Sequence, residues 1–137
     1  MILFDQECIH DPESGVFGDC ARACIRTVAQ DPMPLLPHPI APSGGEWNLE
    51  FFDTLEDLYG WAHQTMVYHP TRDFAPLPRV IMAAGPTVRT KPETGGPLHL
   101  VVWDRLAGRM VHDPHPSRAG LISITAVDWL QPLDPAT

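Results

Sequence analysis

Apolar residues recur at helical spacing in a segment that begins near residue 20. An apolar stripe at positions i, i+3, i+4 and i+7 is formed by Ala21, Cys24, Ile25 and Val28. Asp19 stands where an N-cap residue would be. The pattern predicts a helix that starts after Asp19 and ends near Ala29, with Arg22 and Arg26 on the opposite side, facing water.

A second amphipathic segment covers residues 48–63. Its apolar positions with helical spacing are Phe51, Phe52, Leu55, Leu58, Tyr59 and Ala62, and its acidic residues lie between them. We therefore expect a second helix here. Residues 31–45, which separate the two segments, contain five prolines and predict an irregular, semi-rigid connector.

The second half of the chain has the short apolar runs of β-strands. We expect strands over residues 65–69, 79–85, 98–104, 109–113 and 121–124, followed by a short helical turn that starts at Thr125 and Asp128. The sequence RLAG between the third and fourth runs is a suitable hairpin connection. Helices followed by antiparallel strands predict an α+β fold, and 137 residues suit one domain over residues 1–137.

Composition narrows the classes of function. The chain has 44% hydrophobic and 19% charged residues and a net charge of −8, which argues against a nucleic-acid or anionic-membrane surface. No apolar run approaches the roughly 20 residues that span a bilayer, and the first residues lack the pattern of a secretory signal. Three cysteines do not suggest a disulfide framework, so we expect a cytoplasmic protein with free thiols.

Cys20 and Cys24 differ in their expected environments. Cys24 belongs to the apolar stripe and is expected in the core. Cys20 would be the first helical residue, where unpaired N–H groups and the helix dipole favour a thiolate and lower the thiol pKa. Cys20 is therefore either a nucleophile or a small residue that closes the core.

His99 is the one polar residue in the apolar run LHLVVW, and its hairpin suggests a partner. The predicted turn pairs His99 with Pro114, or with Asp113 if the register shifts by one residue. Asp113 would then accept a hydrogen bond from one ring nitrogen of His99 and leave the other for a thiol. A nucleophile, a base and a residue that orients the base are thus all present.

The segments DCARACI and HLVVWDRLAGRMVHDP resemble papain-like cysteine peptidases, most closely the double-glycine leader peptidases, and are similar to small phage-associated papain-like proteins. The resemblance implies a helix packed against an antiparallel sheet, with Cys20 as nucleophile, His99 as general base and Asp113 as its orienting residue. The family places an oxyanion-hole glutamine about six residues before the cysteine, but position 14 of this chain is serine. Gln6, the only glutamine upstream, takes that role if the intervening loop returns it to the site.

The expected function is therefore a thiol hydrolase that cleaves a peptide or isopeptide bond in a peptide or protein substrate, without a cofactor. One alternative is an inactive, phage-encoded papain-like binding module that engages a host protein. A second alternative is a zinc-stabilised interaction domain, since zinc ligands of suitable type are present in Cys8, His10, Cys20 and Cys24.

Overall fold

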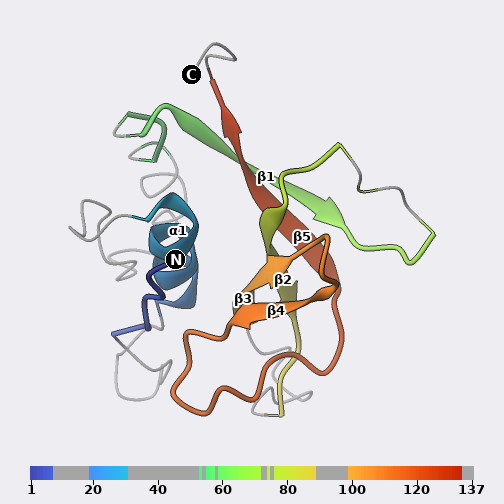
Figure 1. Ribbon diagram of the computed structural model, residues 1–137. Coiled ribbons are helices and arrows are strands. Elements are labelled where there is room, and N and C mark those ends of the chain that lie inside the picture. The colour runs from blue at the N-terminus through green and yellow to red at the C-terminus, as the bar shows by residue number, and fades with distance from the viewer. Residues whose placement is uncertain are drawn as a thin grey trace, which may run out of the picture.

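A computed structural model describes residues 1–7, 19–30, 53, 55–57, 59–71, 74, 76–88 and 99–133. Its regular elements are α1 (Cys20–Ala29), β1 (Trp61–Val67), β2 (Val80–Gly85), β3 (His99–Asp104), β4 (Arg109–His112) and β5 (Ala126–Pro132). The strands form one antiparallel sheet in the order β1-β5-β2-β3-β4 (Figure 1). The predicted α+β fold is confirmed. The predicted connector over residues 31–45 lies outside the described residues.

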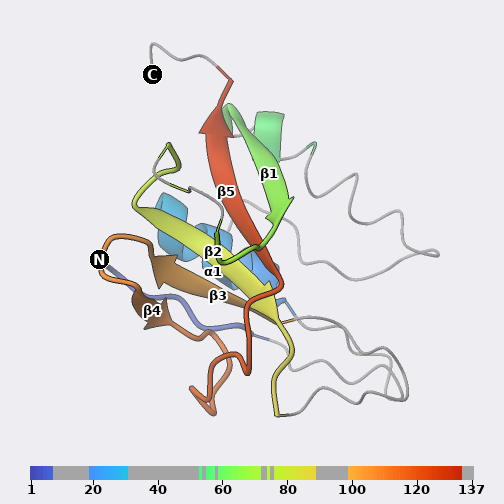
Figure 2. The same ribbon diagram turned by 90° about the vertical axis from the view of Figure 1, so that its right-hand side faces the viewer.

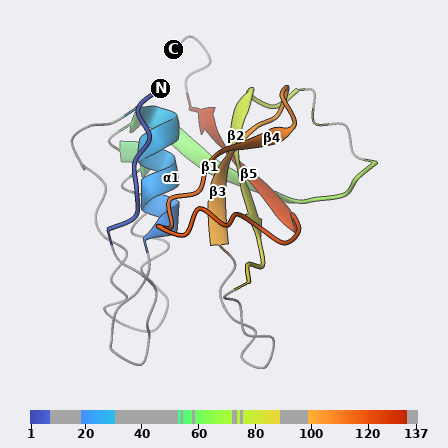
Figure 3. The same cartoon turned by 60° about the horizontal axis from the view of Figure 1, so that its bottom comes forward.

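Helix α1 has the predicted bounds and packs on the sheet, mainly against β3 (Figure 3). The shared core contains Cys24, Ile25, Leu55, Met82, Ala84, Leu100, Val102 and Leu130. Cys24 is therefore a core residue, as its place in the apolar stripe predicted. No helix in the described part of the chain is long and apolar enough to cross a membrane.

The prediction that Arg22 and Arg26 face water is wrong. Both arginines are buried, because residues 1–7 run antiparallel to α1 and cover this side of the helix. Glu7 pairs with Arg22 Nη1 at 3.3 Å and with Arg26 Nη1 at 3.7 Å, and the Arg26 guanidinium lies 4.3 Å from the centre of the Phe4 ring. The charges of α1 are thus neutralised by the N-terminal segment rather than by water.

The second predicted helix ends before residue 63, and residues 48–52 lie outside the described residues. Residues 53, 55–57 and 59 are helical, but Gly60 has a φ of 66° and its N–H donates to the Glu56 carbonyl. A left-handed glycine at this place ends a helix. Strand β1 follows at once and pairs along its length with β5, so the strand predicted over 65–69 begins earlier, at Trp61, and ends at Val67.

The last predicted elements are also wrong. Residues 121–124 are not a strand. A helical turn was expected to start at Thr125 and Asp128, but the chain forms β5 there, from Ala126 onward. Asp128 fits inside this strand because its carboxylate lies 3.4 Å from His63 Nε2 on β1. A buried aspartate normally disfavours a strand, but this partner on the neighbouring strand compensates for it.

The β3–β4 hairpin contains an irregularity that changes its register. Asp104 pairs with Arg109 and Trp103 with Met110, as the predicted turn requires, but Val102 pairs with His112. The extra residue at Val111 is a bulge, and it moves the pairing beyond the predicted register. His99 and Asp113 are therefore not ladder partners. This part of the prediction is wrong.

Candidate functional site

His99 and Asp113 are nevertheless joined by their side chains. His99 is the first residue of β3 and Asp113 follows β4 directly, so both lie at the same end of the hairpin (Figure 1). His99 Nε2 and Asp113 Oδ1 are 2.6 Å apart. The predicted hydrogen bond is confirmed. It leaves the other ring nitrogen, Nδ1, for a reacting group.

Asp113 is buried and held from three sides. Besides His99, its carboxylate accepts the His115 N–H at 2.9 Å on Oδ1 and the Gly120 N–H at 2.8 Å on Oδ2. Burial acts to raise the pKa of Asp113, but the hydrogen bonds from His99, His115 and Gly120 outweigh burial and lower the pKa. Asp113 is thus a fixed anion beside an imidazole, which stabilises the ring when it takes up a proton.

Cys20 is the first residue of α1 and is half-buried at the edge of the core cluster. Burial raises the pKa of its thiol above the ordinary value of 9.0. The backbone N–H groups of Leu100 and Ala21 oppose this rise, and the negative charges of Asp19 and Asp113 add to it. The predicted lowering of the pKa is therefore wrong for the resting protein, because burial outweighs the helix dipole.

His99 and Cys20 are near in the fold but not hydrogen-bonded. The Leu100 N–H that lowers the Cys20 pKa belongs to the residue after His99. Within the described residues, however, no hydrogen bond links the Cys20 thiol to the His99 ring. The charge of Asp113, which His99 contacts at 2.6 Å, also acts on the Cys20 thiol. The structure joins His99 to Asp113, and not to the Cys20 thiol.

Gln6 lies beside the segment that carries Asp113. Its backbone N–H donates to the Pro114 carbonyl at 3.1 Å, so residues 1–7, which also bind α1, pass beside the end of β4 (Figure 2). The N-terminal segment therefore returns to this end of the molecule, as the role of Gln6 requires. Residues 8–18, which connect it to α1, lie outside the described residues.

Two residues of the loop after β4 belong to this region and were not predicted as part of it. The His115 ring packs edge-on against the His99 ring, with 6.2 Å between their centres. Arg118 Nη1 donates to the Asp113 carbonyl at 2.6 Å. The sequence VHDPHPSRAG contains both, but nothing in its spacing indicates that the loop folds back on Asp113.

Of the four residues proposed for zinc, Cys20 and Cys24 lie within the described residues, one helical turn apart on α1. Cys24 Sγ donates to the Leu100 carbonyl at 3.3 Å within the core, and burial raises the pKa of its thiol far above the ordinary value. Cys8 and His10 lie outside the described residues. Among those that are described, no three histidine, cysteine or acidic side chains are placed to hold a metal ion.

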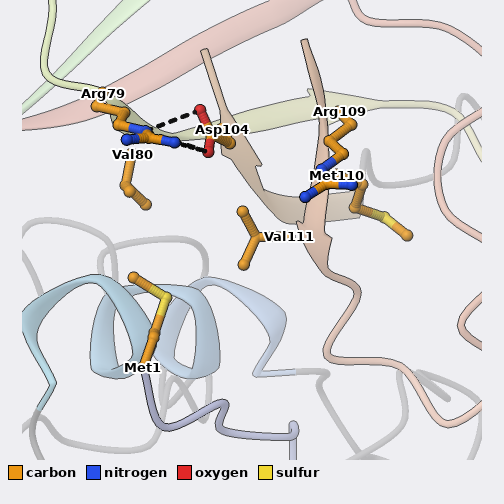
Figure 4. A pocket seen from close by; sticks show the side chains of 7 residues that line it. All are labelled: Met1, Arg79, Val80, Asp104, Arg109, Met110 and Val111. Atoms are coloured by element: carbon orange, nitrogen blue, oxygen red, sulfur yellow. Dashed lines mark hydrogen bonds and ion pairs between the residues drawn. The ribbon is translucent and has the colours of Figure 1, made fainter. Parts of the chain in front are cut away.

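A hollow of about 560 Å³ lies at the other end of the hairpin (Figure 4). It is lined by Met1, Arg79, Val80, Asp104, Arg109, Met110 and Val111. Asp104 ends β3 and His99 begins it, so the hollow is separate from the candidate site.

Comparisons of the chain with protein-family models, with curated proteins and with solved structures found no match.

Proposed function

We propose that this protein is a papain-like thiol hydrolase that acts on an amide bond of a peptide or protein, with Cys20 as nucleophile and His99 as general base. The observation that carries the proposal is the 2.6 Å contact between His99 Nε2 and the buried carboxylate of Asp113. An imidazole held in this way has one tautomer and a stabilised protonated form, which are the properties of a base that serves a nucleophile.

The raised pKa of Cys20 determines the order of the chemical steps. The resting thiol keeps its proton, so no thiolate waits for the substrate. His99 Nδ1 would take the proton as Sγ attacks the carbonyl carbon, and return it to the leaving amine when the acyl-enzyme forms. Water would then hydrolyse the thioester with the same base.

This sequence requires the thiol and the ring to approach each other when a substrate binds. Catalytic hydrogen bonds are often long in proteins without a substrate and shorten in the complex. The Gln6 side chain would donate to the developing oxyanion together with the Cys20 N–H. The position of Gln6 beside Pro114 is consistent with this role.

A specific observation favours a second function, that of a binding module which keeps this architecture without catalysis. The Cys20 thiol has a raised pKa and no hydrogen bond to His99. Both features suit a half-buried thiol that closes the core. In this case the His99–Asp113 pair would serve only to fix the end of the hairpin.

Labelling with a peptide electrophile distinguishes the two functions. An N-acetyl dipeptide vinyl sulfone should form one adduct at pH 7, which peptide mapping after intact-mass measurement should place on Cys20. His99→Ala should slow this reaction about 100-fold or more, since general bases contribute factors of this size. His69→Ala, which alters an exposed histidine next to Thr71, is the matched control and should have no effect.

A wild-type rate equal to that of His99→Ala, with both proteins folded, would exclude catalysis and leave the binding module. An adduct on Cys24 in place of Cys20 would also contradict the proposal.

A further inference from the structure

The position of Gln6 depends on a contact between residues 1–7 and the loop after β4. This segment has no regular secondary structure and is held by individual contacts. Its early residues bind the far end of α1, where the Ile2 N–H donates to Gln30 Oε1 at 2.8 Å. After Gln6, Glu7 contacts the start of α1, whereas Asp5 and the Gln6 backbone contact residues 112–118.

Asp5, which precedes Gln6, makes the side-chain contacts with the loop after β4. Its Oδ1 lies 2.7 Å from Arg118 Nη1 and 3.0 Å from Nε2 of the buried His112. The hydrogen bond from Arg118 is the main reason that the pKa of Asp5 is lowered, with the charge of His112 acting in the same direction. Asp5 is therefore an anion between two nitrogen donors.

Arg118 connects this anion to the candidate site. The same Nη1 that binds Asp5 donates to the Asp113 carbonyl at 2.6 Å and approaches the His115 carbonyl at 3.3 Å. Arg118 itself has a φ of 54°, a conformation that few side-chain-bearing residues adopt. The loop thus keeps an unfavourable backbone conformation at the residue that joins Asp5 to Asp113.

We infer that Arg118 is a positioning residue, which through Asp5 holds Gln6 at a fixed place relative to the His99–Asp113 pair. The inference rests on the proposed function, because that function is the reason why Gln6 needs a fixed position. The contact itself can be tested without an activity assay. Arg118 and Asp5 are half-exposed, so their ion pair adds little to global stability and the variants should fold.

The first measurement is hydrogen exchange at the Gln6 backbone N–H, which binds the Pro114 carbonyl. In Arg118→Met this amide should exchange about tenfold faster, while the amides of β3 keep their protection. Arg118→Lys, which can still pair with Asp5, should restore most of the protection. Arg79→Met is the matched control, because Arg79 pairs with Asp104 at 3.1 Å at the other end of the hairpin. It should leave Gln6 unchanged.

The second measurement uses an N-acetyl dipeptide aldehyde. Cys20 Sγ adds to the aldehyde carbon, the C=O π bond breaks, and the thiol proton passes to the oxygen, which gives a hemithioacetal whose oxygen occupies the oxyanion position. Arg118→Met should weaken binding about tenfold, as should Gln6→Ala. Alkylation by iodoacetamide forms no such oxygen centre, so its rate should not change in either variant.

The outcomes separate the two proposals. Unchanged exchange of the Gln6 amide in Arg118→Met would overturn the positioning role, as would full aldehyde affinity in Arg118→Met together with a loss in Gln6→Ala. A wild-type protein that binds no aldehyde, but whose Gln6 amide responds to Arg118→Met, would contradict the proposed hydrolase and support the positioning contact.

Discussion

An aspartate lies at each end of the β3–β4 hairpin, and the two aspartates make the same local hydrogen-bond pattern with the backbone that follows them. Asp104 Oδ1 accepts the N–H groups of Leu106 at 3.0 Å and Ala107 at 2.9 Å. Asp113 Oδ1 likewise accepts an N–H group two residues further on. Aspartates that bind the next backbone N–H groups are common in turns.

The partners and the burial of the two carboxylates differ. Asp104 faces Arg79, whose side chain is 62% exposed, and the hydrogen bond from Arg79 lowers the Asp104 pKa at the surface. Asp113 is 1% exposed, and its cation partner is an imidazole that can gain and lose a proton near neutral pH. The same turn pattern thus supports a surface turn at Asp104 and a buried aspartate–histidine pair at Asp113, and the side chain opposite the aspartate decides which.

Replacing each aspartate with asparagine should give the largest changes in the free energy of unfolding, and the two positions should differ strongly in the size of the loss. Asp113→Asn turns an NH₂ group toward at least one of three donors that need an acceptor, so the free energy of unfolding should fall by roughly 1.5–3 kcal/mol. Asp104→Asn should cost much less, because water can replace the lost partner. Urea denaturation of both variants measures this difference. Equal losses would mean that burial does not distinguish the two ends.

A pair of glycines offers a smaller, matched test. Gly108 and Gly120 have φ values of 66° and 73°, and each donates its N–H within the turn of its own aspartate, Gly108 to the Asp104 carbonyl and Gly120 to Asp113 Oδ2. Alanine should cost about 1–2 kcal/mol at either place, since left-handed backbone disfavours a Cβ.

Gly120→Ala should cost more than Gly108→Ala. An added Cβ would lie 3.3 Å from Met110 Sδ at Gly120, but meets nothing within 4 Å at Gly108. Thermal unfolding of both variants gives the order. A larger loss in Gly108→Ala would contradict the tighter packing that we assign to the Asp113 end.

Local patterns along the chain were sufficient to predict α1 and the strands β2, β3 and β4. They failed where a distant segment determines the structure. Arg22 and Arg26 belong to the polar side of an amphipathic helix, and only the return of Glu7 and Phe4 buries them. The strand β5 was missed because Asp128 is unfavourable in a strand until His63 is placed beside it.

In the candidate site, too, the features set by local sequence were predictable, and those set by distant segments were not. The hairpin brings His99 and Asp113 to one end by local connectivity, so their hydrogen bond was predictable, although the bulge at Val111 was not. The Cys20 pKa was mispredicted because the helix dipole is a local property, whereas burial depends on the packing of the whole sheet. Arg118 and His115 were missed since their partners depend on how a loop folds back.

The most direct test of a His99–Asp113 pair that serves Cys20 compares two probes on Asp113→Asn. Iodoacetamide reacts with the small thiolate fraction in equilibrium with the resting Cys20 thiol, and removal of the Asp113 charge removes one cause of the raised Cys20 pKa, so this alkylation should not slow. The N-acetyl dipeptide vinyl sulfone should require the oriented His99 and react at least about tenfold more slowly. Asp104→Asn, as the control from the other end of the hairpin, should change neither rate. Equal responses of the two probes to Asp113→Asn would contradict the assignment of His99 and Asp113 to the chemistry of Cys20.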